Sequence, residues 1–253
     1  MKKYYRGNAI YDLIESTYNF RYTSENLWIL VYGNREADPK VILLLSGYSK
    51  DDYESKSLTT KESEMLIYTE QISHKSGVPF LYVRFNGDAS KLTDVKIMVT
   101  GKFKTISTDE YRNILVGFGI QQNNRSCSKP INSQASNVYH LWQKDCGLDI
   151  ITSDIDLMYV DSELDITDVY ELKRSYIPMD DWAPYSNDFN NFILLSKLFE
   201  PCKINFYILF NQYQKFPYVD DINKLKIYKV TCDGKLNLEN QGIKDLADFL
   251  LRK

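Results

Sequence analysis

The chain contains few of the residues that support disulfide or zinc chemistry. Its 253 residues include four cysteines and two histidines, and no two cysteines form a C-x-x-C pair. We therefore expect no zinc centre. A reducing, cytoplasmic environment fits this cysteine usage better than a disulfide-rich secreted scaffold does. The cysteines are Cys127, Cys146, Cys202 and Cys232.

Long hydrophobic runs are also missing. A membrane-spanning helix needs roughly 18 or more consecutive apolar residues, and no such stretch occurs, so no membrane association is expected. Residues 1–6 carry positive charge but no apolar segment follows them, which argues against a secretory signal. No G-x-x-x-x-G-K-[ST] run is found, so no nucleotide-driven motor is expected in this chain.

A positive net charge is the third absence. The formal net charge is −3, which provides no general attraction to nucleic acid, so any basic surface would have to be confined to one groove. Apolar residues make up 43% of the chain and can form a sizeable core. The length suits one large domain or two small ones.

Hydrophobic periodicity predicts an α/β region in residues 1–116, which we interpret as an accessory or substrate-recognition domain. Residues 117–133 are rich in Gly, Asn, Gln and Ser and predict a long loop, with which a second domain at 117–253 begins. In the first region we expect helices at 8–18, 61–74 and 108–115, and strands at 27–32, 41–45, 78–85, 95–100 and 102–107.

The second region is predicted to alternate between helices and strands. Helices are expected at 136–144, 188–199 and 243–251, and strands at 150–151, 154–160, 168–175, 203–210 and 225–230. The order is helix, strands, helix, strand.

Two of these strands carry charges that are unusual in buried strands. Asp156 enters an apolar run, and Glu171 and Lys173 lie two apart on the next strand, where side chains of that spacing share one face. Three unpaired charges in a core would be costly. Two carboxylates with a neighbouring lysine can instead hold a divalent cation and place positive charge near a reacting oxygen.

This pattern resembles the PD-(D/E)XK nuclease superfamily, whose motif is an acidic residue on one strand and Glu/Asp-x-Lys on the next. The matching residues are Asp156, Glu171 and Lys173, and the proline that begins the motif is absent. The resemblance implies a restriction-endonuclease-like core, a mixed sheet flanked by helices. It also implies metal-dependent hydrolysis of DNA that leaves a 5′ phosphate. By analogy with the family, a homodimer could cut both strands.

The resemblance assigns a role to each motif residue. Asp156 and Glu171 would be metal ligands, together with the backbone carbonyl of Leu172, and Asp154 is an alternative or supporting ligand. Lys173 would orient or activate the attacking water and offset charge on the phosphate. Because all these ligands are oxygens, we expect Mg²⁺, for which Mn²⁺ can substitute.

Candidate contacts to the DNA backbone are Arg125, Lys129, Lys144 and Arg174. Arg174 follows Lys173 directly and therefore faces the other side of the strand. An endonuclease is favoured over an exonuclease, because nothing in the sequence indicates a threading ring.

Two alternatives remain open. The chain could be a catalytically silent nuclease-like module that binds a protein or nucleic acid. It could also be an unrelated α/β enzyme or assembly protein in which the three charges are surface groups. Burial distinguishes these cases, because side chains in open solvent on a flat sheet would form no site. The aromatic residues Trp182 and Tyr185 could stack on bases, but we expect them to wedge a loop against the core.

Overall fold

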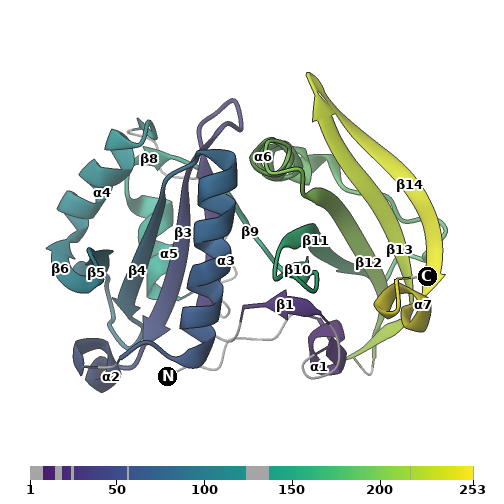
Figure 1. Ribbon diagram of the computed structural model, residues 1–253, viewed down its shortest axis with the longest axis horizontal. Coiled ribbons are helices and arrows are strands. Elements are labelled where there is room, and N and C mark those ends of the chain that lie inside the picture. The colour runs from purple at the N-terminus through teal and green to yellow at the C-terminus, as the bar shows by residue number, and fades with distance from the viewer. Residues whose placement is uncertain are drawn as a thin grey trace. The chain divides into compact units, whose positions relative to one another are not determined.

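The computed structural model describes residues 8–14, 19–23, 26–55, 57–123, 137–216 and 218–252. The protein is a mixed α/β protein that divides into two compact units, and each unit is built on a six-stranded mixed sheet (Figure 1). Residues from Thr23 to Asp154 belong to the first unit. The second unit combines the segment ending at Tyr22 with the segment beginning at Ile155, so in sequence the first unit is an insertion in the second.

The sheet of the first unit has the order β6-β5-β4-β3-β2-β9. Only β3 and β4 are parallel neighbours. A small separate ribbon pairs β7 with β8. The strands are β2 (Leu27–Gly33), β3 (Pro39–Tyr48), β4 (Phe80–Asn86), β5 (Asp94–Val99), β6 (Lys102–Ser107), β7 (Gln121–Gln122), β8 (Leu148–Asp149) and β9 (Ile151–Asp154), and the helices are α2 (Lys50–Ser55), α3 (Thr60–Ser76), α4 (Thr108–Gly117) and α5 (Val138–Asp145).

Helices cover both faces of this first sheet. Helix α3 lies against β2, β3 and β4 on one face, and α4 and α5 contribute Tyr111 and Tyr139 to the core on the other. The ends of α3 follow standard capping chemistry: Thr59 and Glu62 form a capping box, and Gly77 ends the helix with a φ of 71°.

A buried ion pair links α3 to the sheet. The side chains of Glu62 and Arg84 are each 3% exposed, and Arg84 Nη2 lies 3.3 Å from Glu62 Oε2. The hydroxyl of Tyr82 and the backbone N–H of Thr59 also donate hydrogen bonds to the Glu62 carboxylate, and the guanidinium lies 4.1 Å from the ring centroid of Phe103. The charge of each side chain is offset by its partner, and the carboxylate accepts further hydrogen bonds, as a buried charge requires.

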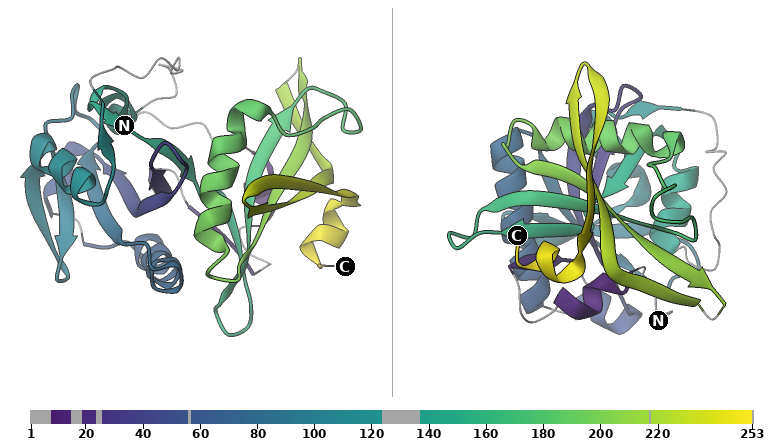
Figure 2. Two further views of the ribbon diagram at one scale, coloured as in Figure 1. Left: turned by 90° about the horizontal axis from the view of Figure 1, so that it is seen from above. Right: turned by 90° about the vertical axis from the view of Figure 1, so that its right-hand side faces the viewer.

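The sheet of the second unit has the order β1-β10-β11-β12-β13-β14, in which β11 and β12 are the parallel pair. The β13–β14 hairpin is long, as Figure 2 shows. The strands are β1 (Phe20–Tyr22), β10 (Leu157–Val160), β11 (Ile166–Ser175), β12 (Asn205–Lys215), β13 (Tyr218–Asp233) and β14 (Lys235–Asp245), and the helices are α1 (Ile10–Ile14), α6 (Phe189–Phe199) and α7 (Leu246–Leu250), with a 3-10 turn η1 at Ser186–Asp188.

Helices α1 and α7 pack on one face of this second sheet. Ile10 and Ile14 of α1 join Phe249 of α7 in a core cluster that includes Tyr170 and Leu209. Residues of the opposite parity point to the other face, where α6 lies against β12 and β13. Glu171 and Lys173 therefore point to the α6 side of the sheet, and Arg174 points to the opposite side.

Several predicted boundaries differ from the structure. The division between the units falls after Asp154, whereas the sequence suggested a boundary between 116 and 117. The cause is tertiary pairing: β9 forms the edge of the first sheet by pairing with β2, and Tyr139 of α5 enters the first core. The predicted helix at 243–251 is also shorter, because β14 extends to Asp245 through pairing with β13.

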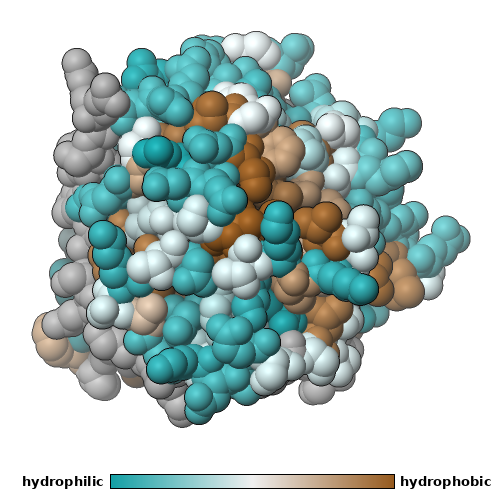
Figure 3. Space-filling view, turned by 90° about the vertical axis from the view of Figure 1, so that its left-hand side faces the viewer, coloured by the Kyte–Doolittle hydropathy of each residue, from teal (hydrophilic) through white to brown (hydrophobic). Residues whose placement is uncertain are grey.

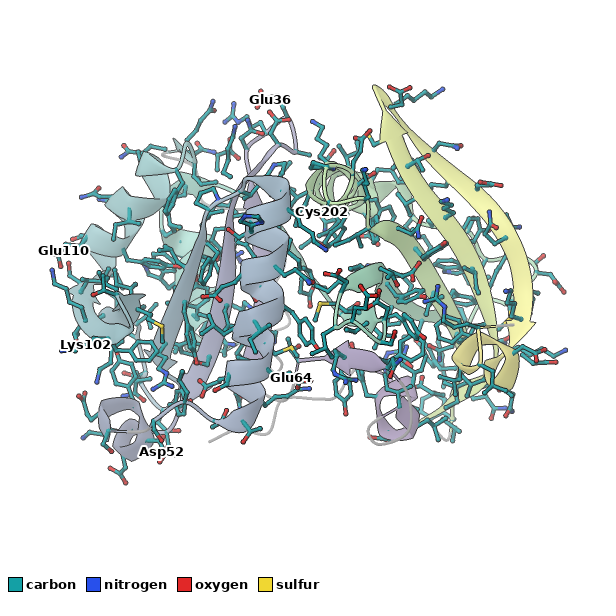
Figure 4. The ribbon with its side chains drawn as sticks, viewed as in Figure 1. Glu36, Asp52, Glu64, Lys102, Glu110 and Cys202 are labelled. Atoms are coloured by element: carbon teal, nitrogen blue, oxygen red, sulfur yellow. The ribbon has the colours of Figure 1, made fainter. Side chains whose placement is uncertain are left out.

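Figure 3 shows one side of the molecule, on which hydrophobic residues form a patch bordered by hydrophilic ones. Lys102 and Glu110 of the first unit point into solvent, and Cys202 follows α6 (Figure 4). No helix among the described residues is long and apolar enough to cross a membrane.

Candidate active site

Asp156 lies immediately before β10 and is half-buried. Its Oδ2 accepts a hydrogen bond of 2.8 Å from the backbone N–H of Leu172 on β11. The β10–β11 ladder reaches the pair Leu157–Tyr170, so Asp156 is held just beyond the end of the ladder, beside the Glu-x-Lys segment. The predicted acidic residue and the predicted motif strand are therefore neighbours.

Glu171 and Lys173 point to the face of β11 that packs against α6. The ammonium of Lys173 lies 2.8 Å from Glu171 Oε1 and 5.7 Å from the ring centroid of Phe192 on α6. The Glu171 side chain is 6% exposed and that of Lys173 is 23% exposed. These charges do not stand in open solvent on a flat sheet, which was the arrangement that would have excluded a site.

A third carboxylate, Asp188, was not predicted as part of this group. Its Oδ2 lies 3.4 Å from Lys173 Nζ, because η1 and the start of α6 bring it over the end of β11. In the sequence, Asp188 indicated only a helix start. A possible signal was its place at the head of the apolar helix that follows the motif strand.

The charges around Lys173 favour its protonated form. Burial acts to lower the pKa of Lys173, but the carboxylates of Glu171, Asp188 and Asp156 outweigh it and hold the pKa above the ordinary value for lysine. At neutral pH the side chain is therefore a cation. It can neutralise negative charge and donate hydrogen bonds, but it has no free electron pair with which to take a proton from water.

The donor chemistry of this group fits a hard cation. The carboxylates of Asp156 and Glu171 supply oxygen ligands. The N–H and C=O of one strand residue point to the same side, so the Leu172 carbonyl lies on the side of Asp156. Mg²⁺ is commonly held by one or two carboxylates, with water and substrate oxygens completing its shell. Within the described part of the chain, no group of three or more His, Cys, Asp or Glu side chains is arranged to hold a metal.

Asp154 belongs to the other unit. Asp154 ends β9, is exposed, and pairs with Leu30 in the sheet of the first unit, whereas Asp156 belongs to the second unit. The charge of Asp154 acts on His140 of α5, whose pKa is lowered by burial and partly restored by this carboxylate. Its role as an alternative ligand stays a prediction.

Two of the predicted DNA-backbone contacts lie among the described residues, one in each unit. Arg174 faces away from Lys173, and its Nη1 lies 3.3 Å from Asp220 Oδ2. Lys144 belongs to α5 of the first unit. Arg125 and Lys129 lie outside the described residues.

The aromatic residues Trp182 and Tyr185, in the segment after β11, behave differently. Trp182 is 1% exposed and stacks on Phe210 with ring centroids 4.1 Å apart, so it packs in the core. Tyr185 is 45% exposed, and its hydroxyl donates a hydrogen bond to Ser175 Oγ at 3.2 Å. The expectation of a loop wedged against the core is confirmed for Trp182.

Comparisons with known proteins add little to this geometry. No protein-family model matches the chain, and no curated protein matches it. Among solved structures, a crystal structure of a sex pheromone staph-cAM373 precursor aligns at 11% identity with a TM-score of 0.22, covering 97% of this chain and 83% of that one. A TM-score of this size carries no structural argument.

Proposed function

We propose that the protein is a metal-dependent nuclease that hydrolyses phosphodiester bonds in DNA, and that it acts as an endonuclease. The observation that carries this proposal is the convergence of Asp156, Glu171 and Lys173, joined by the Leu172–Asp156 hydrogen bond and the Lys173–Glu171 ion pair. The carboxylates are oriented before substrate arrives, which lowers the cost of assembling a catalytic group.

The order of elements in the second unit supports the same proposal. Helix α1 and strand β1 precede the inserted unit, and β10, β11, α6 and β12 follow it. The unit therefore has the order helix, three strands, helix, strand, with β11 and β12 parallel. This is the order that the restriction-endonuclease-like resemblance implies. We expected the helix at 136–144 and the strand at 150–151 to be the first helix and the first strand of this order. In this proposal, α1 and β1 take those two places.

Each residue of the group has a chemical task in this proposal. Asp156, Glu171 and the Leu172 carbonyl would hold Mg²⁺ or Mn²⁺, which supplies Lewis acidity and an acidified water when bound. The ammonium of Lys173 donates hydrogen bonds to the oxygens of the phosphate and stabilises the negative charge that develops on them. Asp188, 3.4 Å from Lys173, orients that ammonium from the side of α6.

The test is cleavage of circular and linear DNA by the wild type, Lys173→Ala and the matched control Lys235→Ala, each with Mg²⁺ and with EDTA. Lys235 is exposed at the start of β14, at the β13–β14 turn. We expect cutting by the wild type and Lys235→Ala in Mg²⁺, and none by Lys173→Ala or in EDTA. Circular dichroism checks that the variants are folded. If the folded wild type cuts no DNA or RNA with Mg²⁺ or Mn²⁺, the proposal fails and a silent binding module becomes the better reading.

A further inference from the structure

Strand β14 forms one edge of the second sheet, beyond β13 in the strand order. Among the described residues, no strand other than β13 pairs with it, and Figures 1 and 2 show it along the outside of its unit. The strand is 11 residues long, whereas strands are commonly about 5–6 residues long. Its outward N–H and C=O groups therefore form a long template on which another strand can pair.

The first half of β14 lacks the features by which natural edge strands avoid pairing. Its ladder with β13 is regular up to the pair Tyr228–Asn240, and the register shifts only between this pair and Ile227–Gly242. Residues 235–239, which we call the edge segment, contain no proline and carry one positive and one negative charge. A bulge, a proline or a row of like charges is the usual protection, and the edge segment has none of the three.

The side chains of the edge segment alternate between two chemically different sides. Lys235, Asn237 and Glu239 are exposed on one side, and Leu236 and Leu238 are half-buried on the other. Within the described part of the chain, neither Lys235 nor Glu239 has an ion-pair partner. The segment thus presents two opposite charges on one side and a partly exposed apolar pair on the other.

The edge segment is complementary to itself when it is read in the opposite direction. Residues that lie directly opposite each other in an antiparallel pair share one side of the sheet. If Asn237 lies opposite Asn237 of a second copy, Lys235 lies opposite Glu239 and Leu236 lies opposite Leu238, and a two-fold axis repeats each pair. Opposite charges and apolar side chains in such cross-strand pairs stabilise a sheet, whereas like charges destabilise it.

Neighbouring registers lose this match. Moving the centre of the pairing to Leu236 places Lys235 opposite Asn237, and it brings Glu239 opposite the carboxylate of Asp233. Moving the centre to Leu238 places Glu239 opposite Asn237. Only the register centred on Asn237 joins both charges to their opposites and both leucines to each other.

We propose that β14 is a contact surface between two copies of this chain, which pair antiparallel through the edge segment about a two-fold axis at Asn237. The two second sheets then join into one continuous sheet. A second copy is favoured over a different protein, because the edge segment carries its own complement in charge and in apolar side chains. The pairing mode is strand addition at a sheet edge, in which main-chain hydrogen bonds provide affinity and side chains select the partner.

This inference does not depend on the proposed nuclease function. Strands β10 and β11 carry the candidate site, and β12 and β13 separate them from β14 in the sheet. The candidate site is therefore complete within each copy, and a substitution at Lys235 leaves it unchanged.

The first test measures the mass of the protein in solution by light scattering coupled to size-exclusion chromatography. We expect the wild type to form a dimer as its concentration rises from about 1 μM to about 100 μM, the range in which small interfaces associate. Glu239→Lys and Lys235→Glu each place like charges opposite one another and should weaken dimerisation about tenfold. Lys91→Glu, the same charge change at an exposed lysine of the first unit, should dimerise like the wild type.

Charge exchange distinguishes a direct contact from a general loss of structure. The chain that carries both Lys235→Glu and Glu239→Lys restores the two opposite-charge pairs and should dimerise like the wild type. An equimolar mixture of the two single variants should form a heterodimer, because each variant supplies the charge that the other needs. Circular dichroism checks that each variant is folded.

A cysteine at the two-fold axis tests the register. Directly opposite residues have Cα atoms about 4.5–5.5 Å apart, which lies within the range of about 4.4–6.8 Å that a disulfide requires. Asn237→Cys should therefore form a disulfide-linked dimer on oxidation, seen on a non-reducing gel. Asn240→Cys is the matched control, because three residues on each side of the axis separate the two cysteines by roughly 20 Å, and it should show no more linked dimer than the wild type.

The inference is overturned if the wild type stays monomeric at about 100 μM, or if both single charge variants dimerise as it does. It is also overturned if neither the double variant nor the mixture recovers the dimer, or if Asn240→Cys links as readily as Asn237→Cys. A dimer with these properties supports the edge contact even if no DNA is cut. Cleavage by a monomeric wild type supports the nuclease proposal alone.

Discussion

The backbone N–H of Leu172 and the carboxylate of Asp156 form a 2.8 Å hydrogen bond that joins the two halves of the candidate site. Because Leu172 lies between Glu171 and Lys173, the same strand that presents the lysine also positions the acidic residue before β10. The backbone of β11 therefore fixes where Asp156 lies relative to Glu171 and Lys173.

The first prediction separates Asp156 from its neighbour Asp154. Asp156→Asn keeps an oxygen that can accept the Leu172 N–H but removes the charge that would hold a cation. DNA cleavage in Mg²⁺ should fall by at least about 100-fold. Asp154→Asn, on the exposed end of β9, should cleave at close to the wild-type rate. Equal loss in both variants would mean that Asp154 also serves the site.

The second prediction concerns the buried pair in the first unit. Glu62→Gln leaves the Arg84 guanidinium without its carboxylate at 3% exposure, and we expect the free energy of unfolding to drop by about 3 kcal/mol. Glu64→Gln is the matched control on the same helix, because Glu64 pairs with Lys61 on the surface, where such pairs contribute about 0.5 kcal/mol. Urea titrations followed by circular dichroism give both values, and similar losses would contradict this account.

The same carboxylate predicts a pH dependence. Burial acts to raise the pKa of Glu62, but hydrogen bonds from Thr59, Tyr48 and Tyr82 and the charge of Arg84 lower the pKa below its ordinary value of 4.5. The unfolded chain therefore takes up a proton first as pH falls. The contribution of Glu62 is fully present above about pH 5 and is lost as pH drops through 4.5 towards the lowered folded pKa. Wild type should lose stability more steeply than Glu62→Gln over this range in urea titrations at several pH values, and parallel curves would argue against the shift.

The strands and helix around the motif could be predicted from local patterns. Apolar alternation and caps indicated a strand at 168–175 and a helix at 188–199, which correspond to β11 and α6. These elements depend on short-range sequence, since the strand carries alternating side chains and the helix ends before Pro201. The motif residues are therefore in the elements to which the sequence assigned them.

The division into units depends on contacts that no local pattern reveals. Strand β1 pairs with β10, matching Tyr22 with Leu157 across the whole inserted unit, while β9 turns to the other sheet only two residues before Asp156. The sequence predicts one continuous strand at 154–160. The structure breaks it at Ile155 and Asp156, because β9 pairs in one sheet and β10 in the other, and no local pattern reveals these pairings. Likewise, Asp188 reaches Lys173 only through the packing of α6 against the sheet.

The last prediction tests Trp182 and Tyr185, two aromatic residues in the segment after β11. Trp182 lies between Phe210, on which it stacks at 4.1 Å, and strand β13, whose Lys226 and Tyr228 donate hydrogen bonds to the Trp182 carbonyl at 2.7 and 3.2 Å. Trp182→Ala should open a cavity and reduce the free energy of unfolding by about 3–5 kcal/mol. Tyr185→Ala, which truncates a side chain 45% exposed, should cost less than about 1 kcal/mol. Chemical denaturation measures the free energy of unfolding of both variants. Fluorescence anisotropy with labelled single-stranded DNA measures whether either variant has lost DNA binding. If Trp182→Ala remained as stable as the wild type but lost DNA binding, the indole would be a base-stacking group, and the core assignment would be wrong.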